Sequence, residues 1–120
     1  MPNNFKLMFA NKNLENLLML DLSYNRNVDD KVIKTIAKNC PKLKILEIKE
    51  CELIHDKGIE AVVKHCNKIQ KLGLSGILKL TNKFLCEINV NLPELRHLGK
   101  SINYVLLLTY KINFQILNDI

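Results

Sequence analysis

The apolar positions of this chain recur with a spacing of 26 residues. One column of apolar residues comprises Leu17, Leu43, Ile69 and Leu95. The column three residues later comprises Leu20, Leu46, Leu72 and Leu98. The register runs from Asn4 to Leu98 without an insertion or a deletion. Such internal repetition is typical of proteins built by stacking one small structural unit several times.

Within each repeat, the spacing of the apolar residues changes from that of a strand to that of a helix. In the segments 20–22, 46–48 and 72–74, the first and third residues are apolar and the middle one is not, which is the alternation of a short strand. Helical spacing follows in Ile33-Ile36-Cys40, Ile59-Val62-Cys66 and Leu85-Ile88-Leu92. We therefore predict a strand, a turn, a helix of about three turns and a return loop in each repeat.

Residues that favour helix ends also keep the 26-residue register. Asp30, Asp56 and Asn82 share one position, and Asn4 falls in the same column. Side chains of these types accept hydrogen bonds from the free amides at a helix N-terminus, so we expect this column to cap the helices. Prolines at 41 and 93 cannot continue a helix and are expected to end it.

Neither face of such a repeat can be buried without a neighbour. Stacking places the strands in one parallel row, the helices in another, and a continuous core between them. The sequence therefore predicts an α/β fold, a curved, right-handed leucine-rich-repeat solenoid with strands inside and helices outside. We assign the repeats to residues 1–98, with a helical segment at 4–14 and repeats starting near residues 17, 43, 69 and 95. Residues 99–120 are assigned as a degenerate repeat, a cap or a tail.

The segment from Cys40 to Ile59 resembles the cysteine-containing leucine-rich repeat. The matching residues are Cys40, Pro41, Leu43, Leu46, Ile48, Cys51, Ile54, Asp56, Gly58 and Ile59. His55 departs from the family pattern, which has threonine there, and Asn25 and Ile77 replace the second cysteine in the flanking repeats. The resemblance implies a relationship to F-box/leucine-rich-repeat proteins and to relatives that lack the F-box. Neither end shows a polar cap, so a piece of a longer array is expected.

The same resemblance implies a function. In F-box members the repeats hold a protein substrate, while the F-box docks to an SCF-type ubiquitin ligase. The expected partner is therefore a protein substrate or regulator, with ubiquitin-ligase subunits only where an F-box lies upstream. An F-box-free regulatory scaffold is the alternative. A basic surface that binds nucleic acid is a further, less favoured alternative.

The cysteines are explained by their positions in the repeat. Cys40 and Cys66 fall in the column of Leu14 and Leu92, and Cys51 falls in the turn after a strand. Buried free cysteine behaves as a small hydrophobic residue. We therefore expect structural thiols rather than metal ligands, nucleophiles or a disulfide.

No catalytic, cofactor or metal site is predicted. The cysteine spacing lacks the Cys-x2-Cys pair of a zinc site. Cys86 is expected to be exposed, but nothing places a histidine base beside it. The segment 73–76 lacks the length and the Lys-Ser/Thr of a phosphate-binding loop. We expect a binding protein rather than an enzyme.

The charge changes this interpretation little. Lysine and arginine number 18 against 12 acidic residues, a formal charge of +6, and lysine columns lie on the predicted convex side. Acidic residues interrupt these columns and no aromatic residues interleave with them, so a solvated helix face is favoured over a nucleic-acid surface. The sequence shows no signal peptide and no apolar run of membrane-spanning length, which predicts a cytoplasmic or nuclear protein without a membrane partner.

Strand residues that point away from the core are the candidates for binding a partner. They line the concave side, which solenoids use to hold other proteins. These candidates are Met19, Asp21, Ser23, Tyr24, Ile45, Glu47, Lys49, Lys71 and His97. The alternative is that they are solvated strand positions without a binding role.

Overall fold

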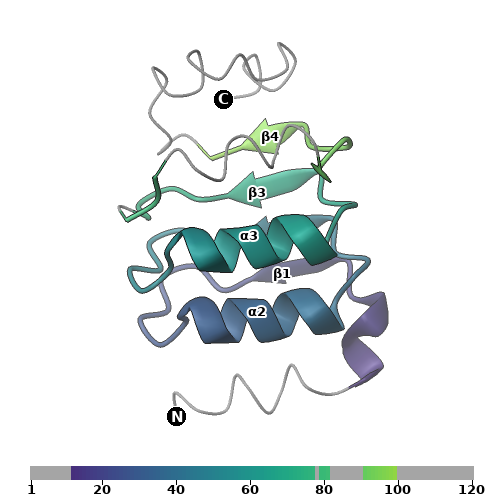
Figure 1. Ribbon diagram of the computed structural model, residues 1–120, viewed down its shortest axis with the longest axis horizontal. Coiled ribbons are helices and arrows are strands. Elements are labelled where there is room, and N and C mark those ends of the chain that lie inside the picture. The colour runs from purple at the N-terminus through teal and green to yellow at the C-terminus, as the bar shows by residue number, and fades with distance from the viewer. Residues whose placement is uncertain (1–11, 78, 82–90, 100–120) are drawn as a thin grey trace.

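The computed structural model describes residues 12–77, 79–81 and 91–99 of the chain (Figure 1). The elements, in chain order, are a 3-10 helix η1 (Lys12–Asn16), β1 (Met19–Asp21), α2 (Asp30–Asn39), β2 (Ile45–Glu47), α3 (Asp56–His65), β3 (Lys71–Gly73) and β4 (His97–Leu98). The sequence-based predictions for residues 4–11, for 82–90 including Cys86, and for 100–120 lie outside the described residues.

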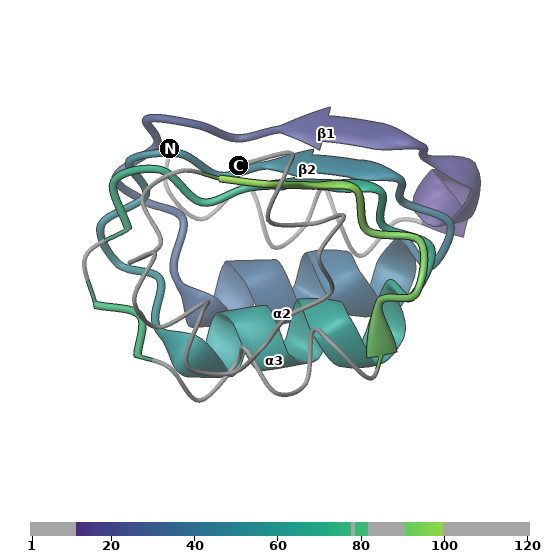
Figure 2. The same cartoon turned by 90° about the horizontal axis from the view of Figure 1, so that it is seen from above.

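The described strands form one parallel sheet in the order β1-β2-β3-β4. Leu20, Leu46, Leu72 and Leu98 pair in succession, so strands 26 residues apart are direct neighbours. Parallel neighbours need a crossover connection, which α2 supplies between β1 and β2 and α3 between β2 and β3. Figure 2 shows the strands in one layer and the two helices in another. The predicted class, α/β with the parallel strands and helices of leucine-rich repeats, is confirmed.

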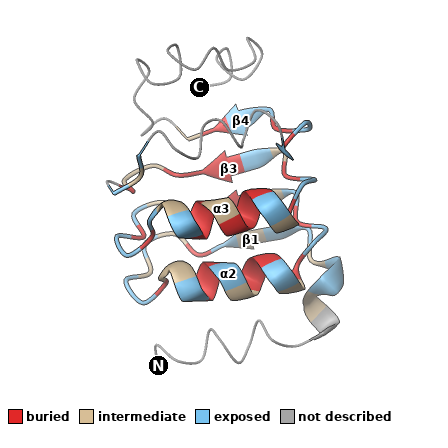
Figure 3. Cartoon of the chain, in the orientation of Figure 1, coloured by how far each residue is buried: buried red, intermediate tan, exposed pale blue. Residues whose placement is uncertain are grey.

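The core lies between the two layers and is continuous from repeat to repeat (Figure 3). Leu46 and Leu72 point into it from the strands, and both are fully buried. Ile33, Ile36 and Ile59 meet them from the helices and are also fully buried. Burying one such side chain contributes roughly 1.5–3 kcal/mol, so the stacked apolar columns supply the main stabilisation.

The two helices begin in different ways, and the prediction about their caps was wrong by one residue. Asp29, not Asp30, is the N-cap of α2, and its Oδ1 accepts a hydrogen bond of 3.0 Å from the Val32 amide. His55 occupies the N-cap position of α3 and makes no side-chain cap bond. The predicted capping residues Asp30 and Asp56 are instead the first helical residues.

These two aspartates bind the following repeat instead of their own helix. Asp30 Oδ1 accepts a hydrogen bond of 2.8 Å from the His55 amide, and Asp56 Oδ1 accepts one of 2.9 Å from the Thr81 amide. Gly58 makes the close approach possible, because a Cβ there would lie 2.6 Å from Asp30 Oδ1. The column of aspartates therefore ties successive repeats together, which single-helix capping rules do not anticipate.

Candidate partner-binding site

The predicted contact residues lie side by side along the strands, but not all of them reach solvent. Among them, Met19, Asp21, Tyr24, Lys71 and His97 are exposed. Ser23, Ile45 and Lys49 are partly buried, and Glu47 is buried. Because the strands pair in register, these side chains form one continuous surface on the side of the sheet away from α2 and α3.

Exposed apolar groups gather at the β1 end of this surface. Met19 is 57% exposed and Tyr24 is 72% exposed. Leu18 is 50% exposed and was not among the predicted contact residues. Tyr24 also adopts a positive φ of 66°, in a region that few non-glycine residues occupy. Glu50, at the equivalent turn of the next repeat, has a φ of 59°. The β1 end therefore offers apolar contact area to a partner.

Glu47 is not the solvent-facing acid that the strand pattern predicted. Its side chain is only 9% exposed, and its carboxylate lies 3.1 Å from Lys71 Nζ and 3.8 Å from Lys49 Nζ. The next residue in the same column is Gly73, where an added Cβ would collide with that carboxylate. The missing side chain at Gly73 lets Glu47 lie across β3, where the two lysines cover it.

A hollow of about 320 Å³ opens beside Glu47 on the same face. Its lining consists of Glu47, Lys49, Lys71, Leu72, Gly73, Ser75, His97, Leu98 and Gly99. The small residues at 73, 75 and 99 create the depth, and the two lysines stand beside the buried carboxylate. The sequence contains one signal for this hollow. The column that holds Glu47 continues with Gly73 and Gly99 in the next two repeats, and neither glycine has a side chain to fill the space.

Polar groups at the β1 end are partly occupied within the protein. Asp21 Oδ1 accepts a hydrogen bond of 2.9 Å from the Ser23 amide, and this bond holds the pKa of the Asp21 carboxyl below its usual value. Ser23 Oγ accepts a hydrogen bond of 3.1 Å from the Lys49 amide. Asp21 therefore stays ionised near neutral pH, while Ser23 joins the first strand turn to the second.

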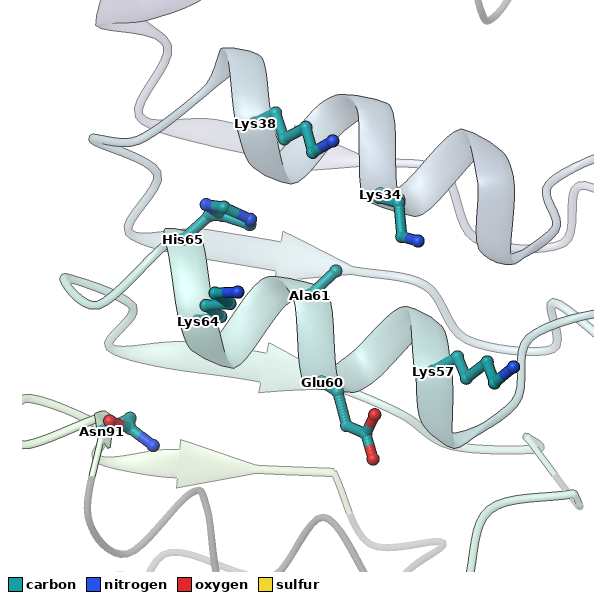
Figure 4. Close-up of a pocket in the computed structure, with 8 residues that line it drawn as sticks. All are labelled: Lys34, Lys38, Lys57, Glu60, Ala61, Lys64, His65 and Asn91. Carbon is teal, nitrogen blue, oxygen red and sulfur yellow. The ribbon is translucent and has the colours of Figure 1, made fainter.

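A second hollow, of about 580 Å³, lies on the opposite, convex side (Figure 4). Its lining consists of Lys34, Lys38, Lys57, Glu60, Ala61, Lys64, His65 and Asn91. Figure 4 shows the lysine side chains spread along α2 and α3 rather than meeting at one point. His65 is the one aromatic ring in the lining, which contains no Phe, Tyr or Trp, so this surface offers mainly diffuse positive charge.

The described thiols are buried, as their positions in the repeat predicted. Cys40, Cys51 and Cys66 are free and fully buried. Cys51 Sγ donates to the Leu22 carbonyl at 3.2 Å, and Cys66 Sγ donates to the Cys40 carbonyl at 3.4 Å. Burial raises the pKa of all three thiols, that of Cys66 to about 12. A protonated, buried thiol is a poor nucleophile and a poor metal ligand.

No group of three or more His, Cys, Asp or Glu side chains in residues 12–77, 79–81 and 91–99 is placed to hold a metal ion. In the same ranges, no helix has both the length and the apolar character needed to cross a membrane.

Comparison with known protein families identifies one segment of the chain. Residues 39–63 match the family described as Leucine Rich repeat. The matched segment contains β2 and the greater part of α3. No curated protein shows a significant match to the sequence. Residues 39–63 are thus a leucine-rich repeat, and arrays of such repeats form protein-interaction modules.

Proposed function

We propose that this chain is a protein-binding module that holds its partner on the concave face, defined by the outward side chains of β1 to β4 and the turns that follow them. The observation that carries this proposal is the row of outward side chains that runs across adjacent strands from Met19 to His97. Met19, Lys71 and His97 in this row are exposed and Ile45 is partly buried, and a hollow opens beside the row over β2 to β4. A rigid parallel sheet positions such groups at little entropic cost on binding. The module acts by binding and carries no catalytic role of its own.

The test needs the partner and two sets of variants. The full-length chain is used to capture interacting proteins from its native cell, and one candidate is then purified for affinity measurement. Met19→Ala with Tyr24→Ala removes exposed apolar area from the concave face, whereas Lys38→Ala with Lys64→Ala changes the convex face. We expect the first pair to weaken binding about tenfold and the second pair to change it less than about twofold. The reverse order of effects would reject the concave face as the binding surface.

At a finer level, we propose that the module recognises a substrate for an F-box-type ubiquitin ligase and so promotes ubiquitin-dependent degradation. The support is the resemblance of the segment Cys40 to Ile59 to the cysteine-containing repeat of F-box proteins. The alternative is a regulatory scaffold without a link to ubiquitin. Purification of the natural full-length gene product separates the two, because the ligase proposal requires the adaptor subunit of the ligase to copurify.

A further inference from the structure

We propose that the hollow beside Glu47 receives an acidic side chain of the partner protein. This inference rests on the proposed function, since it assigns a chemistry to one part of the concave face. It begins from an unusual feature. Among the residues that the structure describes, Glu47 is the one charged residue in the buried class, with 7% of its surface exposed. A carboxylate is expensive to bury unless other groups compensate for its charge.

The compensation at Glu47 exceeds what one carboxylate needs. Two ammonium groups, those of Lys49 and Lys71, lie within 4 Å of it, and both line the hollow. One carboxylate against two ammoniums leaves a net charge of +1. The hollow therefore carries a net positive charge, although the carboxylate of Glu47 is part of its lining.

Glu47 also prearranges the two lysines. Lys71 Nζ is 3.1 Å from Oε2, within hydrogen-bond distance, whereas Lys49 Nζ is 3.8 Å from Oε1 and beyond that distance. Oε1 is buried and, within the described part of the chain, receives no hydrogen bond. Each lysine side chain stays between two fifths and one half exposed, at 41% and 46%. An ammonium has three protons to donate, so both lysines keep protons for a further acceptor.

The shape of the hollow suits one side chain rather than a broad surface. Gly73, Ser75 and Gly99 are the lining residues with the smallest side chains. The volume of about 320 Å³ is at the small end of the range for ligand pockets. A basic side chain entering here would meet two ammoniums. An apolar one would remove water from three charged groups without compensating them. A carboxylate placed between Lys49 and Lys71 satisfies both lysines and offsets the excess charge.

The chemistry can be tested on the full-length chain without knowing the partner. Amide chemical shifts of the ¹⁵N-labelled protein are followed while acetyl-Gly-Glu-Gly-amide is added, and again with the matched acetyl-Gly-Gln-Gly-amide. We expect the acidic peptide to shift the amides of Gly73, Ser75 and Gly99, and to bind at least about threefold more tightly than the glutamine peptide.

Two variants and one control locate the effect. Lys71→Gln should weaken binding of the acidic peptide about threefold, and Lys49→Gln should do the same. Lys49→Gln is the variant with the smaller risk of a folding defect, because the Lys49 ammonium lies 3.8 Å from Glu47 Oε1 and makes no hydrogen bond to it. Lys38→Gln is the control on the convex face, with the same loss of charge, and should leave binding unchanged. Equal binding of the two peptides, or equal losses in Lys49→Gln and Lys38→Gln, would overturn the inference.

The partner found on the concave face separates this inference from the function on which it depends. If Met19→Ala with Tyr24→Ala weakens partner binding but Lys49→Gln and Lys71→Gln do not, the concave face is the binding surface and the acid-binding role of the hollow is wrong. If none of these variants affects partner binding, both proposals fail. If both sets of variants weaken partner binding, the concave face is the binding surface. The acid-binding role of the hollow is supported as well if replacing one acidic residue of the partner by its amide weakens binding to the parent chain but not to Lys71→Gln.

Discussion

The first two described repeats, residues 17–42 and 43–68, share one hydrophobic pattern but differ in how deeply they bury it. Leu43 and Leu46 of the second repeat are fully buried, whereas Leu17 and Leu20 in the same columns are only partly buried. In the sheet that the structure describes, β2 lies between β1 and β3, while β1 pairs with β2 alone. The burial of a residue in a stacked repeat therefore depends on its neighbours as much as on its own identity.

The polar column shows the same dependence on neighbours. Asp21 of the first repeat is exposed and bonds within its own turn to the Ser23 amide. Glu47 of the second repeat occupies the same column but is buried against Lys71 of the next strand. The residue that follows Asp21 in the column is Glu47, and the one that follows Glu47 is Gly73. Gly73 therefore leaves room for Glu47 to lie flat on the sheet, whereas the position after Asp21 in the column holds the larger Glu47.

The largest expected effect tests the difference in core burial directly. Leu46→Ala should lower the free energy of unfolding by about 2–5 kcal/mol, because it opens a cavity between two packed repeats. Leu20→Ala, at the equivalent position of the first repeat, should cost about half as much, because its side chain starts partly exposed. Urea unfolding of the two variants and the parent chain gives both values. Equal losses would mean that the two repeats are packed equally well.

Alkaline pH gives the next effect, through the buried thiols. The pKa of Cys66 is raised by burial to about 12, above its ordinary value of 9.0, so the unfolded chain loses this proton first. Stability from this group is complete below pH 9 and falls as the pH rises towards 12, by about 1.4 kcal/mol per pH unit.

The measurement for the thiols is urea unfolding at several pH values. Cys66→Ala should remove a large part of the alkaline loss, and Cys40→Ala, one repeat earlier, provides the comparison. The other bases and acids that titrate above pH 9 are common to the parent and the variants, so the difference in slope belongs to the thiol. A parent and a Cys66→Ala variant with parallel pH profiles would contradict the raised pKa.

The smallest expected effect concerns the two helix starts. Asp29→Ala removes the cap of α2 and should cost about 1 kcal/mol, because the Val32 amide loses its acceptor. His55→Ser adds a capping hydroxyl to α3, which has no side-chain cap bond, and should gain about 0.5–1 kcal/mol. Thermal unfolding of both variants at pH 7 measures the changes. A loss of stability in His55→Ser would show that the imidazole contact to Asp30, 3.5 Å away, matters more than the missing cap.

The pattern of the sequence was sufficient for the fold because its signals are local and repeat. Alternation in the strands, helical spacing after Asp29, and proline at position 41 each act over a few residues, and the constant spacing of 26 residues places equivalent strands side by side. The burial of Cys40, Cys51 and Cys66 followed from the same register. Local propensity and global packing agree in these segments, which is why the prediction of the fold class succeeded.

What the sequence by itself determined is the period of the chain, the class of its fold and the face on which each strand residue lies. The tertiary structure alone decided which acid on that face is buried and which acids bond the following repeat. Glu47 lies under Lys49 and Lys71 because Gly73 leaves space beside it, and Asp30 bonds the His55 amide because Gly58 lets the next helix approach. Both arrangements depend on side chains that meet across repeats at distances of a few ångströms, which spacing along one strand or one helix does not encode.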